Sequence, residues 1–269
     1  MSEASPAPTA PATPVTPAAP LPPLPLLYLD EHLAIIDKPA GLLVHRTALD
    51  AHEERFALQM LRDQLGRPVW PAHRLDKGTS GLLAFALDAD TASRLGQAFE
   101  QGEPRKRYLA LVRGWPQDAG VIDHTLARDP ERPSQGQVLL DSRTDYRCLA
   151  RVAWPFSVDG RFPESRYALV EAAPHSGRRH QIRRHFKHIA HPLVGDATHG
   201  KGAHNRAVAE FLGLQRLWLH AWTLSLRHPQ TGETLTLQAP PGPEWAAMLQ
   251  RGDWSRQAEQ EGGVPVPHT

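Results

Sequence analysis

Hydrophobic and polar positions along the chain change between the two-residue period of strands and the three-to-four-residue period of helices. Alternating or short apolar runs predict strands at 26–29, 33–36, 81–87, 108–112, 147–154 and 166–171, and a hairpin of 217–226 with 234–238. Helical spacing predicts helices at 54–65, from Asp88 or Asp90 to Gln101, and at 177–190, with a last helix near Pro243. Many strands, few helices and short connections predict an α+β fold with a largely antiparallel mixed sheet and flanking helices.

The two ends of the chain differ in composition from the rest. Residues 1–25 hold nine of the 26 prolines and a single charged side chain, Glu3. Proline blocks helix formation, and so little apolar surface cannot form a core. We therefore expect a disordered tail at 1–25, one folded domain at 26–250, and a flexible polar tail at 251–269.

Targeting signals are missing from the 269-residue sequence. No run approaches the 18 apolar residues of a membrane span, and the N-terminal stretch lacks the basic start and apolar core of a secretory signal. The lone cysteine, Cys148, excludes an internal disulfide and fits a reducing compartment. These features predict a cytoplasmic protein.

Positive charge is concentrated in one segment. The formal net charge is only +1, but residues 175–206 alone carry +6, so the rest of the chain carries −5. Ile182, Phe186 and Ile189 form one helical stripe that would face the core, which leaves the cations along one edge of a packed helix. Such an edge suits a polyanion, although a solvated helix face is the simpler alternative. A second cluster, Arg105–Arg107, precedes Tyr108.

The basic segment also holds seven of the 15 histidines. His180, His185, His188 and His191 are five, three and three residues apart, whereas zinc hydrolases commonly place two histidines four apart around an acid. No carboxylate follows them until Asp196. The spacing therefore predicts no metal site.

The segment with the clearest chemical signal is 71–83, PAHRLDKGTSGLL. Asp76 lies in a turn before a short, wholly apolar strand, with Arg74 and Lys77 on either side. On local grounds an acid in a tight turn can be a cap or can form an Asx-turn. The segment lacks the spacing of a nucleophile elbow, and no phosphate-binding glycine loop occurs in the chain.

Four ordered motifs resemble those of the pseudouridine synthases of the large-ribosomal and tRNA type. HRLDKGTSG resembles the family's H-R-L-D-x-x-T-S-G motif, and DEHLAIIDKPAGLLVH (30–45) resembles its first motif. KRYLA (106–110) resembles the K-x-Y strand, and GRRHQIRRHFKHIAHPLVGDATHG (177–200) resembles the G-R-x-H-Q-I-R helix followed by H-P-x-x-G-D. The match covers residues 25–240. It implies a pseudouridine synthase fold with a central RNA-binding catalytic cleft.

By this resemblance Asp76 is the essential catalytic carboxylate of a cofactor-independent isomerase. Its role remains open among attack on the sugar, attack on the base and removal of a sugar proton. Arg183 matches the arginine that pairs with the aspartate, and a bidentate contact is expected. Tyr108 matches the tyrosine that stacks near the uracil and accepts the C5 proton, with a neutral packed tyrosine as the alternative.

The same resemblance implies an RNA-binding set around the cleft. Arg74 matches the arginine that fills the space left by a flipped base. The full expected set is His73, Arg74, Arg105, Lys106, Arg107, Arg178, Arg179, Arg184 and Lys187.

Finer features concern the substrate. Two further segments, VHRTALDAHEERFALQMLRDQLG and HNRAVAEFLGLQRLWLHA, resemble the branch of the family that acts on uridine 65 in the acceptor-arm stem of tRNA. His199 stands where most members have a tyrosine. The sequence thus predicts a tRNA substrate and no obligate protein partner. A ribosomal RNA substrate is the alternative, and a non-catalytic RNA-binding protein of the same fold is a more distant one.

Overall fold

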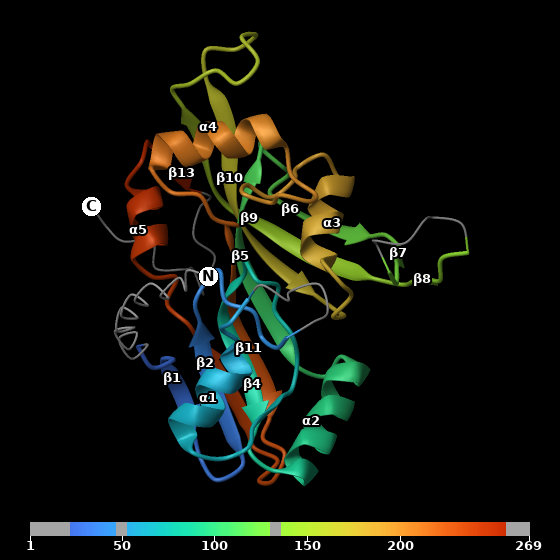
Figure 1. The fold of residues 1–269 in the computed structure, drawn as a ribbon. Helices are drawn as coiled ribbons and strands as arrows, with labels where there is room; N and C mark the ends of the chain where they lie inside the picture. Colours follow the sequence, from blue (N-terminus) through green and yellow to red (C-terminus); the bar gives the residue numbers. More distant parts are fainter. Residues whose placement is uncertain (1–21, 47–52, 130–135, 257–269) are drawn as a thin grey trace, which may run out of the picture.

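A computed structural model describes residues 22–46, 53–129 and 136–256 (Figure 1). The strands are β1 (Leu26–Leu29), β2 (Leu33–Lys38), β3 (Trp70–Pro71), β4 (Ser80–Ala86), β5 (Arg105–Arg113), β6 (Ala119–Asp123), β7 (Leu126–Ala127), β8 (Leu139–Leu140), β9 (Arg143–Trp154), β10 (Ser165–Pro174), β11 (Leu219–Arg227), β12 (Thr234–Gln238) and β13 (Ser255–Arg256). The helices are α1 (Ala57–Leu65), α2 (Ala89–Gln101), α3 (Gln181–His188), α4 (Gly202–Leu212) and α5 (Pro243–Leu249).

Eleven of these strands form one sheet, and the predicted α+β class with a largely antiparallel mixed sheet is confirmed. The main order is β1-β2-β4-β11-β5-β10-β9-β13, with β12 beside β11, β3 beside β4 and β6 beside β9. Only β4 and β11 pair in parallel, at the centre of the sheet. Since β4 follows the Asp76 turn directly, this central pairing brings the turn to the middle of the molecule.

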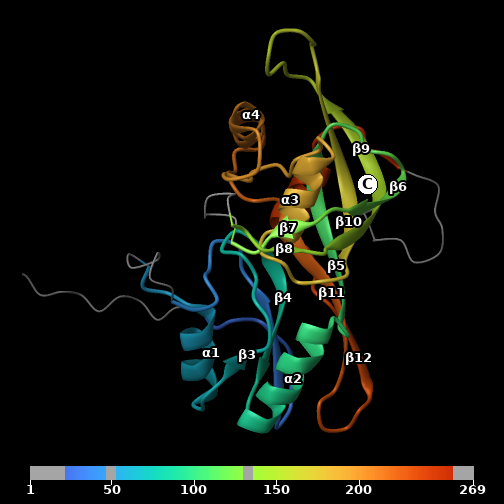
Figure 2. The ribbon, with the colours of Figure 1, turned by 90° about the vertical axis from the view of Figure 1, so that its right-hand side faces the viewer.

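The sheet is covered by helices in two halves (Figures 1 and 2). In the half that contains β1, β2 and β4, helices α1 and α2 pack on opposite faces, over separate apolar clusters. In the other half, α3 packs over one cluster on β5, β9 and β10, whereas α4 and α5 pack over another, rich in tryptophan. The two halves meet where the Asp76 turn, β5 and α3 come together.

Local sequence signals account for both ends of α2, whereas α3 and α4 differ from what the sequence predicts. Asp88 caps α2 by accepting the Thr91 N–H at 2.8 Å, and Gly102 ends it with a φ of 74°. Helix α3 begins at Gln181 and not at 177, because His180 adopts a left-handed conformation with a φ of 53°. Helix α4 was not predicted, and Val208 is its one fully buried residue.

Gly81 shows why a glycine follows the Thr-Ser pair at the start of β4. Its φ is +106°, and a Cβ there would lie 2.2 Å from the carbonyl oxygen of Ala221 on β11. No side chain is compatible with that approach, so the glycine permits the parallel pairing of the two central strands.

The folded region extends slightly past the expected limits of 26 and 250. Leu24 is buried, and its N–H donates to the Gln64 side chain at 2.8 Å. Ser255 pairs with Arg151 on β9. The remainder of the two expected tails, 1–21 and 257–269, lies outside the described residues. Within the described ranges no helix has the length and apolar character needed to cross a membrane.

Candidate active site

Asp76 lies in a turn that is held from both sides. Its carbonyl oxygen accepts the Thr79 N–H at 3.0 Å, and the Lys77 carbonyl accepts the Gly41 N–H at 2.8 Å. The first of these bonds closes the turn, and the second ties it to the loop after β2. The carboxylate is one-fifth exposed, with 19% of its side-chain surface accessible. The turn thus presents an acid at the surface of a rigid centre.

Arg183 on α3 connects Asp76 to a second, buried carboxylate. Its Nη1 donates to Oδ2 of Asp76 at 2.7 Å, while Nε and Nη2 donate to the two oxygens of Asp196 at 2.7 and 2.8 Å. The expected contact between Arg183 and Asp76 is therefore present, but the bidentate contact is made with Asp196. One guanidinium is shared by two acids.

Asp196 is a positioning group that the sequence analysis did not single out. It also accepts the backbone N–H groups of Thr198 and His199 at 2.9 and 2.8 Å. Burial alone would raise the pKa of Asp196, but Arg183 and these two N–H groups outweigh it and lower the pKa. The available signal was the G-D pair of the 177–200 motif.

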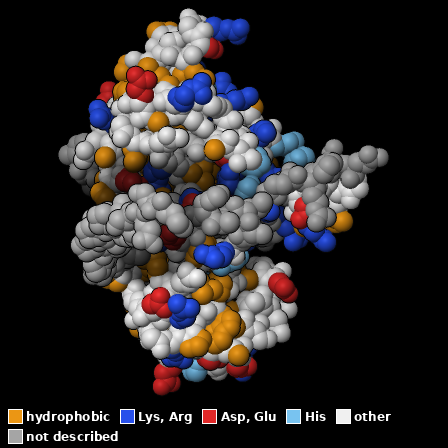
Figure 3. Space-filling view, in the orientation of Figure 1, with side chains coloured by type: hydrophobic (Ala, Val, Ile, Leu, Met, Phe, Trp, Pro, Cys, Tyr) orange, Lys and Arg blue, Asp and Glu red, His pale blue; other side chains and the backbone are white. Residues whose placement is uncertain are grey.

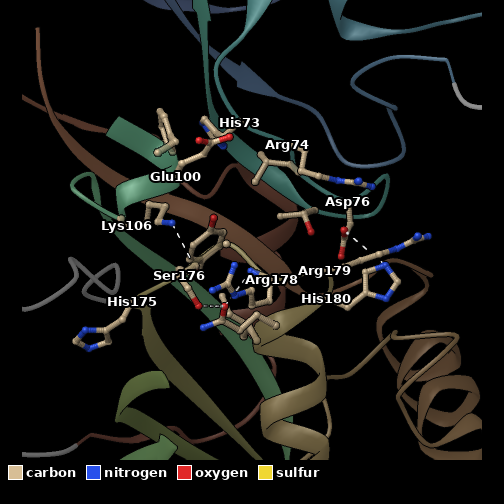
Figure 4. A pocket seen from close by; sticks show the side chains of 18 of the residues that line it. His73, Arg74, Asp76, Glu100, Lys106, His175, Ser176, Arg178, Arg179 and His180 are labelled. Atoms are coloured by element: carbon tan, nitrogen blue, oxygen red, sulfur yellow. Dashed lines mark hydrogen bonds and ion pairs between the residues drawn. The ribbon is translucent and has the colours of Figure 1, made fainter. Parts of the chain in front are cut away.

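Asp76 also faces a pair of histidines. Nε2 of His180 lies 3.7 Å from Oδ1 of Asp76, whereas Arg183 contacts the other oxygen, Oδ2; Figure 4 shows His180 beside Asp76. Nδ1 of the same ring lies 3.0 Å from Nε2 of His199. Burial lowers the pKa of both histidines, that of His199 to about 4, so both rings are neutral near pH 7.

Two cavities, of about 610 and 820 Å³, meet at Asp76. Both are lined by Arg74, Asp76, Arg179, His180 and Arg183. The smaller cavity continues along β5 and the loop before α3, and the larger one extends toward the loop after β2 and residues 195–198. A carboxylate between two cavities is accessible to a ligand that enters from either side.

Tyr108 lines the smaller cavity, next to Asp76. Burial and the negative charge of Asp76 raise the pKa of Tyr108 well above its usual value, so the ring is a neutral phenol in the free protein. Tyr108 can therefore stack against a planar base, and its hydroxyl can exchange a proton only after a change in its surroundings.

The expected Arg105–Arg107 cluster is divided between the two faces of β5. Lys106 points to the same side as Tyr108, lines the smaller cavity and donates to the Ser176 carbonyl at 3.4 Å. Successive strand residues face opposite sides, so Arg105 and Arg107 point away from that cavity. Arg107 lies 3.6 Å from Glu171 on β10. Lys106 is the one member of this cluster at the cavity.

His73 is held by the fold although it reaches the smaller cavity. Its Nε2 accepts the Ala84 N–H at 3.2 Å, and its ring stacks on Phe99 with a centroid distance of 4.6 Å. Burial, with the nearby charge of Lys106, lowers the pKa of His73 to about 3, so the ring is neutral. A neutral ring contributes no charge toward a phosphate.

The remaining expected cations fall into two groups. Arg74, Arg178 and Arg179 line a cavity, and Figure 4 shows Arg74 and Arg179 extending on either side of Asp76. Arg184 instead donates to the Ala127 carbonyl at 2.9 Å, which ties α3 to β7, and Lys187 is exposed outside both cavities. On the face seen in Figure 3, basic and histidine side chains gather where the halves meet.

The four histidines considered for a metal site have other partners. His185 contacts Ser142 and Thr144 at 3.0 and 2.9 Å, His188 stacks on His124, and His191 contacts the Arg113 carbonyl. Across the described ranges no three side chains of the metal-binding types converge.

Comparison with known proteins identifies the family. The model of the family described as RNA pseudouridylate synthase matches residues 32–188. This chain belongs to the RNA pseudouridylate synthase family. A relative from Vibrio cholerae, named tRNA pseudouridine synthase C, is 44% identical over 234 residues, which cover 85% of this chain and 96% of the relative. One from Yersinia pestis with the same name is 42% identical over 91% of this chain and 96% of the relative.

A solved structure agrees with this RNA pseudouridylate synthase assignment. The structure described as human RNA pseudouridylate synthase domain containing 1 superimposes with a TM-score of 0.68 and 25% identity. The superposition covers 88% of this chain and 91% of the human one. The predicted pseudouridine synthase fold and isomerase activity are thereby confirmed.

Lys38 is a second group of this pseudouridylate synthase that the sequence analysis passed over. It is fully buried beneath the Asp76 turn, and its Nζ donates to the carbonyls of Pro39, Leu42 and Lys77 at 2.9, 2.7 and 3.3 Å. Burial lowers the pKa of Lys38 to about 7, although the nearby charge of Asp76 acts in the opposite direction. The D-K-P-A-G segment was the available signal.

Proposed function

We propose that this enzyme isomerises uridine to pseudouridine in tRNA, at position 65 of the acceptor-arm stem, and that Asp76 is its essential carboxylate. The observation that carries the proposal is the location of Asp76. It lies between two cavities and accepts a hydrogen bond from Arg183, whose guanidinium is also held by the buried Asp196. The names of the 42–44% identical relatives support tRNA as the substrate, and the sequence resemblance supports the position.

The reaction adds no group and consumes no co-reactant. The N1–C1′ bond breaks, the uracil turns, C5 bonds to C1′, and the C5 proton is lost while N1 gains one. Each of the three roles open to Asp76 uses a free carboxylate oxygen near the sugar or the base, and Nη1 of Arg183, 2.7 Å from Oδ2, holds the carboxylate in place. Tyr108 stacks on the uracil, and its hydroxyl exchanges a proton at C5 once the base is bound.

Access to a stem uridine requires base flipping, which costs a few kcal/mol. Arg74, exposed beside Asp76, enters the space that the base leaves, and its planar guanidinium suits that position. Lys106, Arg178 and Arg179 hold phosphates around the smaller cavity. The single domain 26–250 performs this work in the cytoplasm, without an obligate protein partner.

The test uses purified full-length protein and unmodified tRNA and ribosomal RNA transcripts, with EDTA and no added cofactor. Carbodiimide treatment followed by primer extension locates each new pseudouridine. We compare the wild type with Asp76→Asn, which preserves size, and with Asp123→Asn, a control at an exposed position on β6.

A stop at position 65 with the wild type and Asp123→Asn, and none with Asp76→Asn, is expected. Stops only in ribosomal RNA would overturn the substrate. An active Asp76→Asn enzyme would overturn the role of the carboxylate. Bound RNA with no stop in any sample would indicate the non-catalytic alternative.

A further inference from the structure

The side chain of His180 reaches Asp76 because of an unusual backbone conformation. His180 and Ala190 are the non-glycine residues with positive φ among those that the structure describes, and His180 has φ 53° and ψ 29°. Left-handed conformations cost free energy in residues with a Cβ, and they recur at functional sites. The conformation directs the ring into the space where both cavities meet.

The contacts with His199 and with Asp76 together indicate which nitrogen of His180 carries hydrogen. Both rings are neutral, so the 3.0 Å contact between Nδ1 of His180 and Nε2 of His199 needs one hydrogen and one lone pair. If His199 donates, the hydrogen of His180 is on Nε2, which faces Oδ1 of Asp76 at 3.7 Å. The reverse arrangement would direct a lone pair at the carboxylate, which is unfavourable.

We propose that His180 and His199 are positioning residues for the pseudouridylate synthase reaction. His199 holds His180 in the tautomer with hydrogen on Nε2, and that N–H holds Oδ1 of Asp76 while Arg183 holds Oδ2. The carboxylate is thus oriented from both oxygens. The 3.7 Å separation shortens when substrate fills the cavities, as catalytic contacts in free enzymes commonly do.

The same geometry explains the presence of a histidine at 199. The ring receives no carboxylate bond of its own, although its backbone N–H binds Asp196. The charged side chains that act on the His199 ring are Asp196, Arg183 and Lys187. Those that act on the His180 ring are Asp76, Arg179, Arg183 and Asp196. A neutral hydrogen-bond donor is required at position 199, because a permanently charged side chain there would repel the Arg183 cation.

A matched pair of variants separates hydrogen bonding from space filling. In His199→Gln the amide nitrogen replaces Nε2 and can donate to His180, whereas His199→Met has similar length and no donor. His180→Asn is the third variant, because asparagine tolerates the left-handed backbone but cannot reach Asp76. Single-turnover rates and dissociation constants are measured on tRNA transcripts, since the inference rests on the proposed function.

We expect His199→Met and His180→Asn to lower the single-turnover rate about 10-fold, the loss of one hydrogen bond, with RNA affinity unchanged. His199→Gln should stay within about 3-fold of the wild type. Nitrogen NMR of labelled protein should find the hydrogen of His180 on Nε2 in the wild type and in His199→Gln, and a mixture of tautomers in His199→Met.

Equal rates for His199→Met and the wild type would overturn the inference. Equal losses of rate in His199→Met and His199→Gln would also overturn it, because they would mean that the His199 ring only fills space. A hydrogen on Nδ1 of His180 in the wild type would also overturn it. These results are distinct from failure of the proposed function, which an active Asp76→Asn enzyme would reveal.

Discussion

Nη1 of Arg183 lies 2.7 Å from Oδ2 of Asp76, and the same guanidinium makes its two other hydrogen bonds to a buried partner. Burial opposes the charge of Arg183, but the two acids outweigh it and raise its pKa. The cation is therefore permanent, and it is fixed in place before any substrate binds. A carboxylate held this way needs no reorganisation when a ligand binds.

Replacement of Arg183 by lysine should impair catalysis although the charge is retained. One ammonium cannot bond both Asp76 and Asp196, and the buried Asp196 would lose its paired contact. We expect the single-turnover rate to fall roughly 100-fold, equivalent to about 2.7 kcal/mol. The rate is measured as the release of tritium from C5-labelled uridine in tRNA. A rate near that of the wild type would mean that the shared contact is unimportant.

Tyr108→Phe tests the hydroxyl group apart from stacking. The phenylalanine ring preserves the flat surface beside Asp76 and removes only the group whose proton could be exchanged. We expect roughly a 100-fold lower rate with RNA affinity unchanged, the range typical of a lost acid-base group. Unchanged turnover would mean that the hydroxyl takes no part in the chemistry. Tyr108 would then act only as a neutral, packed aromatic ring.

Arg74→Ala should slow the reaction on a paired stem more than on an unpaired target. Since flipping is easiest for a mismatched base, we expect about a 10-fold loss on native tRNA and little loss when the target uridine is mismatched. Arg107→Ala is the matched control, because Arg107 lies on the opposite face of β5 beside Glu171. Equal losses in both variants would show that RNA contacts the far face of the sheet as well.

Lys38 should make stability depend on pH above neutrality. Its pKa is about 7 in the folded protein and close to 10.4 in an unfolded chain, so the unfolded state binds more protons between these values. The contribution of Lys38 to the free energy of unfolding therefore rises from pH 7 to pH 10 and is constant below pH 7.

Urea denaturation at pH 7, 8 and 9 measures this effect against Lys38→Met. We expect the stability of the wild type relative to the variant to increase by about 1 kcal/mol per pH unit. Parallel curves would mean that Lys38 keeps its proton throughout. Lys38→Met should also be less stable at pH 9, because three carbonyl oxygens lose their donor.

Sequence alone determined the elements whose signals are local. The cap at Asp88, the stop at Gly102 and the buried strand after Asp76 follow from short-range backbone and side-chain chemistry, and the structure contains all three. The α+β class and the family were also readable, because both depend on the order of motifs along the chain.

Only the tertiary structure decided which partners the charged side chains contact. It divided the Arg105–Arg107 cluster between two faces, gave Arg183 a second acid, brought Lys38 to the Asp76 turn and placed His199 against His180. Each of these contacts joins residues far apart in sequence or depends on one backbone angle, such as φ of His180. Spacing along the chain carries the periodicity of an element, whereas burial, pairing and the resulting pKa values arise only where several elements meet.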